Sequence, residues 1–491
     1  MKTTEEAAIA VAALRGNQPF RPPAPWPRQG KSTPLQMVSA LWRNPIEAWT
    51  QYHFEQPLVA TRLPFADIAV VSDPAAIRRV LVDNRDNYAK DRFQKRMLAV
   101  LSGGLILAEG DEWYAQRRLL APIFTSRSVH SFAPQMMDVI ADTIEDWRAK
   151  DGAIIDVAED AANLALAVLE RTIFSSGLSA PRSELRDAMR TYFDALGRID
   201  PFDLFDLPDF VPRLSRLSAH SAIRLFHHTV DDMVAARQRD LDGQVDGAPQ
   251  DILTLLIRAR DPENGQGLTQ QEIRANAITL MSAGQESTAD AISWALYLLS
   301  RSPHCREQVC QEAASAFEGA PETIIEHLPV TRAVIDETLR LYPPLAAISR
   351  VAKGPDILAE TKVKAGAMIV IAPYVLHRHR LWGDDADLFD PSRFLPGARA
   401  TIDRYAYLPF GAGARGCIGS IFALQEATLA VAAITRDFEL ELADGHEVWP
   451  VHRITLRPRD GLPMRLRLRR ATAAAAPLPR QSVPPVQAAL S

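Results

Sequence analysis

The sequence predicts a mainly α protein with a smaller β region. The longest helical pattern begins at the capping box Thr269-x-x-Glu272 and continues to about Ser300. Further helical patterns fill most of residues 128–260. Short runs rich in β-branched residues occur before residue 72 and after residue 365. This distribution places the helices in the middle of the chain and the strands towards its two ends.

The N-terminal part supplies the first expected strands. Residues 1–35 are rich in proline and polar groups, which indicates an irregular lead-in. Two strands are expected over residues 57–63 and 66–71. A helix should follow, because Asp73 can cap it and Pro74 suits its first position.

The central part is expected to be helical over residues 132–147, 155–174 and 218–241. Between the last two helices lies an aromatic and proline-rich connection, residues 199–214. Such an apolar segment is either a lid over a site for lipophilic molecules or a packed loop, and the sequence leaves both open.

The C-terminal part is expected to contain a helix over residues 329–342 and several strands. The expected strands cover residues 366–374, 437–442, 454–457 and 464–468. Residues 471–491 are rich in alanine, proline and glutamine, which is typical of a disordered tail. Because no linker divides residues 36–470, they are expected to form a single catalytic domain.

Composition excludes several classes of protein. The 491 residues carry a formal net charge of -5, so no nucleic-acid partner is indicated. The three cysteines, Cys305, Cys310 and Cys417, provide neither a disulfide framework nor a zinc pattern. The apolar stretch at residues 7–14 is too short to span a bilayer. We therefore expect a cytoplasmic protein without a membrane anchor.

One cysteine stands out by its surroundings. Residues 410–419 contain Cys417, four glycines and an arginine, and an apolar helical run follows over residues 421–434. Glycines permit positive φ and a close approach of the backbone to a flat ligand. The N-terminal end of the following helix should favour the thiolate form of Cys417, as an axial metal ligand requires. The alternatives are an inert buried cysteine or a glycine-rich phosphate cradle.

The spacing Phe-x-x-Gly-x-Arg-x-Cys-x-Gly over residues 410–419 resembles the haem-binding loop of the cytochrome P-450 monooxygenases. The resemblance implies a bound haem b (iron protoporphyrin IX), with the thiolate of Cys417 as the metal ligand. It also implies that Phe410 shields the sulfur and that the backbone at Gly411 approaches the cofactor. Arg415 should bind a haem propionate.

A second motif is the pair Trp113-x-x-x-Arg117, whose members lie on one face of a helix. In the family this pair binds a propionate, and the resemblance assigns the same role to Arg350. Buried carboxylates need such cationic donors. The alternative is a helix whose tryptophan only packs. The neighbouring Arg118 is equally cationic, but its side chain points about 100° away from that of Arg117 on the helix.

The middle of the longest helix contains Gly284, Glu286, Ser287 and Thr288. Glycine and hydroxyl side chains weaken the helical hydrogen-bond ladder, so an opened turn that holds water is expected here. The segment resembles the oxygen-activating segment of the family, in which an acid and an alcohol deliver protons. Serine replaces the usual threonine at position 287 but keeps the hydroxyl donor. The alternative is a benign kink in the helix.

A third group of charges should stabilise the cysteine loop. Glu337 and Arg340 lie three residues apart on a helix, and Arg393 follows downstream in Phe-Asp-Pro-Ser-Arg-Phe. These residues resemble the buried charged triad of the family, which implies a structural role. An isolated surface ion pair would contribute little to stability.

The resemblance covers about residues 35–470 and implies the cytochrome P-450 fold, with a β region contributed by both ends of the chain. It implies a monooxygenase that activates dioxygen and hydroxylates or epoxidises a lipophilic small molecule, with fatty acids and terpenoids favoured. Electrons are expected from a separate ferredoxin and ferredoxin reductase. The alternatives are a haem sensor or carrier without turnover and a peroxide-using relative, against which the Glu286-Ser287 pair argues.

Overall fold

The computed structural model describes residues 20–30, 34–63, 66–91, 94, 101–175, 181–196, 219–242, 251–321, 323–469 and 478. The connection at residues 199–214 and nearly all of the expected tail at residues 471–491 lie outside the described residues. The first 19 residues of the expected lead-in lie outside them as well.

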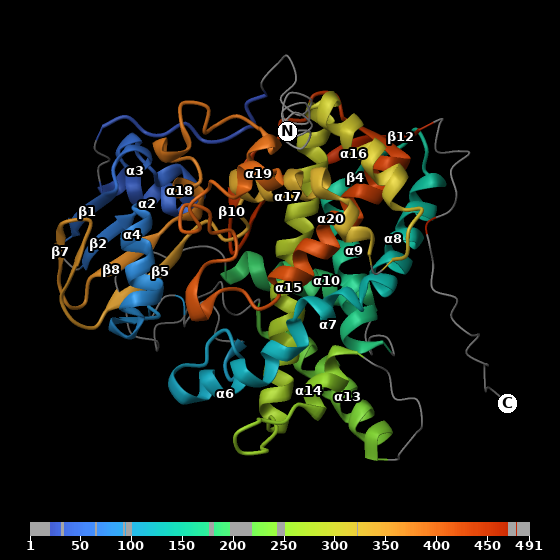
Figure 1. The fold of residues 1–491 in the computed structure, drawn as a ribbon, viewed down its shortest axis with the longest axis horizontal. Coiled ribbons are helices and arrows are strands. Elements are labelled where there is room, and N and C mark those ends of the chain that lie inside the picture. The colour runs from blue at the N-terminus through green and yellow to red at the C-terminus, as the bar shows by residue number, and fades with distance from the viewer. Residues whose placement is uncertain are drawn as a thin grey trace.

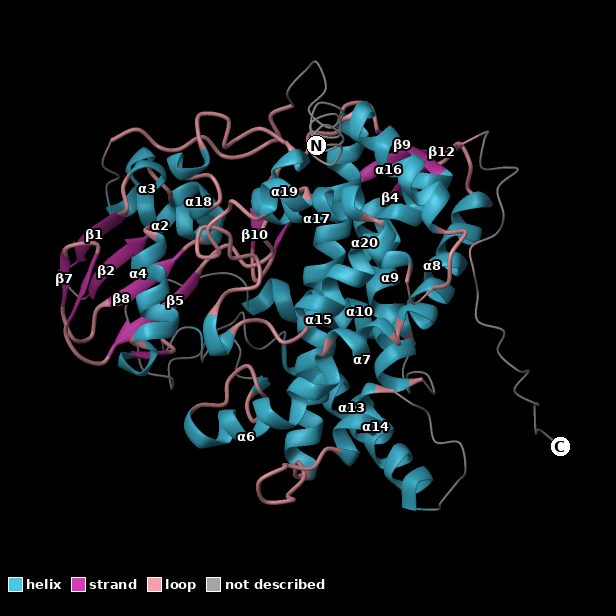
Figure 2. Cartoon of the chain, in the orientation of Figure 1, coloured by secondary structure: helices cyan, strands magenta, loops and turns pink. Residues whose placement is uncertain are grey.

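Helices dominate the described part of the chain, and the strands form a smaller region (Figure 2). The helices are α2 (Pro34–Arg43), α3 (Gln51–Glu55), α4 (Pro74–Arg78), α6 (Gly110–Leu120), α7 (Ser126–His130), α8 (Ala133–Arg148), α9 (Val157–Leu169), α10 (Arg182–Leu196), α13 (Ala219–Asp242), α14 (Ile252–Arg258), α15 (Gln270–Arg301), α16 (Pro303–Ala316), α17 (Pro329–Leu341), α18 (Pro373–Leu376), α19 (Pro396–Arg399) and α20 (Ser420–Asp437). The strands are β1 (Leu58–Leu63), β2 (Ala66–Val71), β3 (Tyr88–Ala89), β4 (Ile154–Asp156), β5 (Ile348–Ala352), β6 (Asp356–Leu358), β7 (Thr361–Val363), β8 (Met368–Ile371), β9 (Phe438–Leu442), β10 (Pro450–His452), β11 (Leu456–Pro458) and β12 (Pro463–Leu468). The expected mainly α architecture is confirmed.

Helix α15 passes through the middle of the molecule (Figure 1). Its start is set by the expected capping box, in which the Thr269 amide donates to Glu272 Oε2 at 2.8 Å and the Glu272 amide donates to Thr269 Oγ1 at 3.3 Å. The helix packs against α9, α17 and α20, so most of its length is buried. The core of the helical part forms around it.

The opened turn expected near Gly284 is not observed. Residues 270–301 are α-helical throughout. A Cβ added at Gly284 would lie 3.1 Å from Leu169 Cδ2, so the missing side chain allows α9 to pack closely. Packing against α9 stabilises this turn in helical form although Gly284, Ser287 and Thr288 have low helix propensities.

The larger sheet joins distant parts of the chain. Its strand order is β1-β2-β8-β5-β3, with β1 and β2 in an antiparallel hairpin and β2 parallel to β8. The sheet lies to one side of the helices, at the left of Figure 1. Its side chains form a second hydrophobic cluster with α4. The expected contribution of both ends of the chain to the β region is confirmed here.

Some expected boundaries were wrong. The strand expected over residues 366–374 ends at Ile371, because Pro373 begins the short helix α18. The helix expected from residue 155 begins only at Val157, since Ile155 pairs with Met464 of β12. Asp156 then caps α9 through the amides of Ala158 and Glu159. Within the described residues, no helix is long and apolar enough to cross a membrane.

Candidate functional site

The loop that carries Cys417 is a tight turn before α20. The Cys417 amide donates to the Phe410 carbonyl at 2.9 Å, and the Gly416 amide donates to the Gly413 carbonyl at 3.0 Å. Gly413 has φ +71°, and a Cβ added there would overlap the carbonyl oxygen of Leu81. Gly411 also has positive φ, at +68°. Only glycine accommodates both the positive φ and the close approach of the Leu81 carbonyl at position 413.

The side chain of Cys417 is accessible to solvent, although protein atoms surround much of it. Burial raises the pKa of the thiol, while a hydrogen bond from the Gly419 backbone and the charge of Arg117 lower it. The thiolate expected from the helix end alone is therefore not favoured, because desolvation outweighs the backbone donor and the cation. A bound metal cation would supply the missing stabilisation of the thiolate.

Arg117 and Trp113 of α6 lie beside this loop, and Arg415 within the loop contacts Trp113. Arg117 Nη1 donates to the Gly416 carbonyl at 3.1 Å, which ties α6 to the loop directly beside Cys417. The guanidinium of Arg415 lies 4.1 Å from the centre of the Trp113 ring and donates to the Ala108 carbonyl at 2.7 Å. Trp113 itself is buried. The structure thus brings the Trp113/Arg117 pair to the cysteine loop, as the motif predicts.

The arginines destabilise one another. Burial, followed by the charge of Arg350, lowers the pKa of Arg415 to about 10, and Arg117 contributes in the same direction. Burial also lowers the pKa values of Arg350 and Arg117. Glu109 opposes these shifts at Arg350 and Arg415. A cluster with this excess of positive charge would bind a ligand that carries two carboxylates.

A second group of expected residues lies on α15. Ser287 Oγ donates to the Ala283 carbonyl at 2.7 Å, so its hydroxyl is held against its own helix. Glu286 Oε1 accepts from Arg457 Nη1 at 3.5 Å. Thr288 is buried, whereas Ala283 is exposed even though most of α15 lies in the core. The exposed position beside Ser287 leaves room for a ligand next to the hydroxyl.

Two buried carboxyl groups were missed by the sequence analysis. Burial, followed by the charge of Glu286 four residues earlier, raises the pKa of Asp290 well above its usual range. Glu426 of α20 is fully buried, and its pKa is raised well above the usual range by burial alone. Neither oxygen of Glu426 has a hydrogen-bond partner among the described residues. In both cases the sequence has an acid within an apolar helical run, and this pattern could have identified the buried carboxyl group.

The charged triad is buried as expected. Glu337 binds Arg340 through two hydrogen bonds of 2.6 and 2.7 Å, and Arg393 Nε lies 3.9 Å from Glu337 Oε1. Arg340 also donates to the carbonyls of His377, Ala386 and Leu388. Glu337 Oε1 in turn accepts from the Asp390 amide at 2.8 Å. These bonds fasten α17 to the chain that leads towards Cys417.

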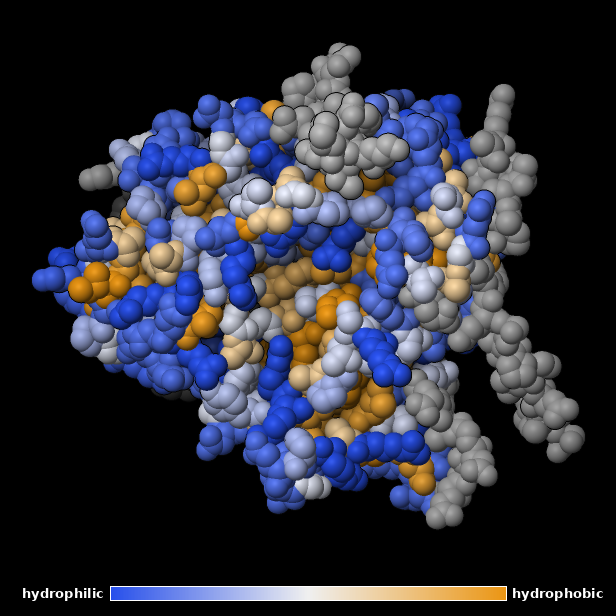
Figure 3. Space-filling view, viewed as in Figure 1, coloured by the Kyte–Doolittle hydropathy of each residue, from blue (hydrophilic) through white to orange (hydrophobic). Residues whose placement is uncertain are grey.

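Apolar side chains are accessible near these groups. Phe410, Ala414, Ile418 and Ile421 are only partly buried around the cysteine, and Leu345 before β5 is 44% exposed. Figure 3 shows apolar side chains gathered at the centre of one face, with charged side chains around them. An accessible cysteine, apolar contacts and an excess of arginines together fit a flat apolar cofactor with anionic substituents, such as haem.

Comparison with known proteins places this arrangement in a family. The family model described as cytochrome P450 matches residues 20–461. The chain is 31% identical over 443 residues to pentalenene oxygenase from Streptomyces avermitilis. This match covers 89% of this chain and 95% of that protein. It is 30% identical over 444 residues to cyclooctat-9-en-7-ol 5-monooxygenase from Streptomyces melanosporofaciens. This second match covers 90% of this chain and 95% of that protein.

A solved structure agrees in its fold. The structure described as the haem domain of cytochrome P450DA superposes with a TM-score of 0.78 at 24% identity, and the match covers 92% of this chain and 99% of that one. The cysteine loop, the arginine cluster and the charged triad all lie within the matched residues 20–461. The chain therefore belongs to the cytochrome P450 family.

Proposed function

We propose that the protein is a haem-thiolate monooxygenase that hydroxylates or epoxidises a lipophilic terpenoid. The observation that carries the proposal is the accessible Cys417 beside the partly buried Arg117, Arg350 and Arg415, of which Arg415 is repelled by the other two. The terpenoid preference is supported by two relatives at about 30% identity whose names denote oxygenation of pentalenene and of cyclooctat-9-en-7-ol. Fatty acids are the second substrate class to test.

The residues around the loop would hold haem b. Cys417 would bind the iron through its sulfur, Phe410 would cover that sulfur, and the backbone at Gly411 would lie against the cofactor. Trp113, Arg117, Arg350 and Arg415 would bind the propionates, which neutralises their mutual repulsion. When bound, the haem supplies the dioxygen-binding iron and the oxidising power.

The residues of α15 would supply protons and position the substrate. Ser287 can donate its hydroxyl proton to a ligand beside Ala283 once it releases the Ala283 carbonyl. Glu286 would restore that proton after taking one up itself, and its contact with Arg457 positions the carboxyl group. Thr288 would be the adjacent hydroxyl. Gly284 contributes by letting α9 pack closely, which sets the position of this turn.

Two electrons would come from a separate ferredoxin and its reductase, in the cytoplasm. No disulfide joins any of the three cysteines, all of which are described, and this supports a reducing compartment. A chain that receives electrons from partners should consume NADPH in a substrate-dependent manner when surrogate ferredoxin and reductase are added.

The decisive experiment is the absorption spectrum of the purified protein after reduction by dithionite, with and without carbon monoxide. The proposal predicts the strongly red-shifted Soret band of a thiolate-ligated complex, and Cys417→Ala should lose it. The control Cys310→Ala alters a half-buried thiol on α16 and should keep the band. Haem binding without that band would favour a sensor or carrier, and failure to bind haem would refute the proposal.

A further inference from the structure

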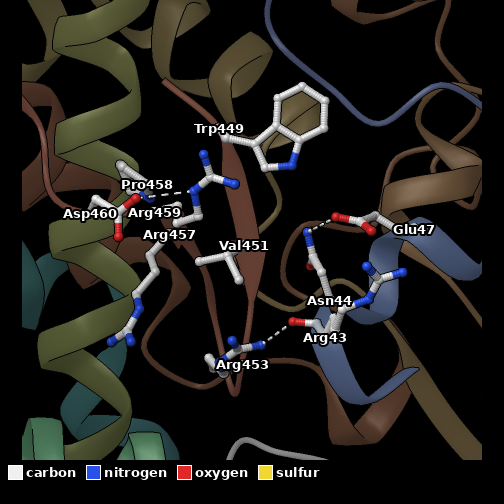
Figure 4. Close-up of a pocket in the computed structure, with 10 residues that line it drawn as sticks. All are labelled: Arg43, Asn44, Glu47, Trp449, Val451, Arg453, Arg457, Pro458, Arg459 and Asp460. Atoms are coloured by element: carbon white, nitrogen blue, oxygen red, sulfur yellow. Dashed lines mark hydrogen bonds and ion pairs between the residues drawn. The ribbon is translucent and has the colours of Figure 1, made fainter. Parts of the chain in front are cut away.

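A cavity of about 400 Å³ lies between the N-terminal helix α2 and the β10–β11 hairpin. It is formed from segments far apart in the sequence (Figure 4). Its walls are Arg43, Asn44, Glu47, Trp449, Val451, Arg453, Arg457, Pro458, Arg459 and Asp460. The cysteine loop contributes no residue to these walls, and Arg457 is the one lining residue that also contacts the α15 group described above.

The charge of the cavity is positive. Four of its ten lining residues are arginines and two are acids. The carboxylate of Glu47 accepts from Asn44 Nδ2 at 3.1 Å, and that of Asp460 accepts from Arg459 Nε at 3.1 Å. Among the described residues, no hydrogen bond or ion pair engages the guanidinium of Arg43. Arg457 is bonded to Glu286 outside the lining, so one excess positive charge faces the cavity.

The cavity walls are held in place by backbone hydrogen bonds. Asn44 donates to the Pro450 carbonyl at 3.0 Å and accepts from the His452 amide at 3.0 Å, which fixes the end of α2 against β10. Arg453 Nη1 donates to the Arg43 carbonyl at 2.9 Å. Strands β10 and β11 pair with each other. These bonds fix the backbone that carries Arg43 and Arg453, which reduces the entropy lost when an anion binds.

We propose that this cavity binds a phosphate dianion, either free or as a phosphomonoester. A guanidinium matches phosphate oxygens through paired hydrogen bonds, and the excess of arginines over acids in the lining favours an anion. Figure 4 shows the guanidinium groups of Arg43, Arg453 and Arg459 on different sides of Val451. The indole of Trp449 forms an apolar wall that suits the organic part of an ester. A recessed cavity favours a small molecule over a flat membrane surface.

The fourth arginine connects the cavity with α15. Arg457 lines the cavity and also bonds Glu286 of the segment proposed to deliver protons. Phosphate in the cavity would compete with Glu286 for this guanidinium. A bound phosphate would therefore alter the charge environment of Glu286. The effect of this change on proton delivery rests on the proposed function. Phosphate binding itself is independent of the proposed function.

Isothermal titration of the purified holoenzyme with inorganic phosphate tests the binding. We expect saturable binding that weakens by at least about tenfold in Arg43→Gln/Arg459→Gln, because charged hydrogen bonds are lost. The control Arg62→Gln changes an exposed arginine on β1 and should leave the affinity unchanged. Absence of saturable binding, or equal weakening in the control, would overturn the proposal.

Three further titrations identify the ligand class. Phenyl phosphate should bind more tightly than inorganic phosphate if Trp449 contacts the ester, and equal affinity would assign the site to free phosphate. Tighter binding to anionic lipid vesicles than to either phosphate would overturn the small-molecule assignment. Succinate should bind more weakly, and preference for it would overturn the choice of phosphate over dicarboxylates.

The link to α15 has its own test. Glu286→Gln removes the carboxylate that shares Arg457 and should tighten phosphate binding, whereas unchanged affinity would overturn the link. Cys417→Ala keeps all ten lining residues and should bind phosphate as the wild type does. Failure of the haem assignment and failure of the phosphate site are therefore distinguishable.

Discussion

At the scale of single residues, adjacent arginines on α6 have different surroundings. Arg117 reaches the Gly416 carbonyl beside the cysteine, and burial lowers its pKa. Arg118 pairs with Asp261 at 2.6 Å and with Glu263 at 2.6 Å. One helical step of about 100° separates the two directions. An arginine that contacts the cysteine loop therefore lies next to one that forms ion pairs with Asp261 and Glu263.

Leucine substitutions at these two positions should separate cofactor binding from stability. Arg117→Leu should reduce the haem bound per protein by about tenfold, because a propionate loses a charged hydrogen bond. It should leave the unfolding free energy of the apoprotein almost unchanged. Absorbance ratios and urea unfolding measure the two effects.

Arg118→Leu is the matched control. It should retain haem but destabilise the protein, since the Asp261 carboxylate loses its charged partner. If both variants lost haem equally, the assignment of Arg117 to the cofactor site would be wrong.

At the scale of elements, the cysteine loop is shaped by its contact with a distant turn. Gly413 lies directly against the carbonyl of Leu81 in the helical turn η2 (Arg79–Asp83). A backbone carbonyl cannot move aside as a flexible side chain can. The position of Cys417 therefore depends on a segment more than 300 residues earlier, and the glycine spacing of the motif has a steric cause.

Three glycine-to-alanine variants separate this steric cause from conformational preference. Gly397→Ala should be neutral or slightly stabilising, because the position is open and lies in α19. Gly445→Ala has open space but φ +77°, so it should cost about 1–2 kcal/mol. Gly413→Ala adds a backbone clash to its positive φ and should cost clearly more. Urea unfolding of the three proteins measures the costs, and equal costs at positions 413 and 445 would exclude the clash.

At the scale of the whole molecule, a buried histidine connects helix, triad and cysteine loop. His377 Nε2 accepts from the Leu408 amide at 2.8 Å, and its Nδ1 lies 3.2 Å from the Arg340 carbonyl. Burial, followed by the charge of Arg340, lowers the pKa of His377 to about 3. The folded protein therefore holds this ring neutral, with Nδ1 as the donor.

This histidine should make the fold sensitive to acid. In the unfolded chain His377 has a pKa of 6.5, so between pH 6.5 and about 3 the unfolded state binds the extra proton. Its stabilising contribution is complete above pH 6.5 and is lost as the pH falls, by up to roughly 5 kcal/mol. The buried carboxyls Asp290 and Glu426 act in the opposite sense, because their raised pKa values favour the folded state in acid.

The variant His377→Gln isolates the contribution of the histidine. Glutamine can still accept from the Leu408 amide but does not titrate. The wild type should be more stable at pH 7, and the difference in unfolding free energy should shrink as the pH is lowered to 5. Parallel stability curves over this range would contradict the assignment of a neutral buried His377.

Local sequence patterns are sufficient to predict several features of this protein. The start of α15 follows from the Thr269 capping box, and the haem-thiolate family follows from the spacing around Cys417. The charged triad was also predicted, because Glu337 and Arg393 lie in recognisable motifs. These features are encoded within a few residues, where capping, helical periodicity and turn geometry act.

The electrostatics and the exact contacts of the site arise from tertiary packing. The raised pKa of the Cys417 thiol, the raised pKa of Asp290 and the bond between Arg457 and Glu286 depend on burial and on segments distant in sequence. The α-helical turn at Gly284 depends on its packing against α9. Desolvation and long-range charge arise only when the chain is folded, so no local pattern specifies them.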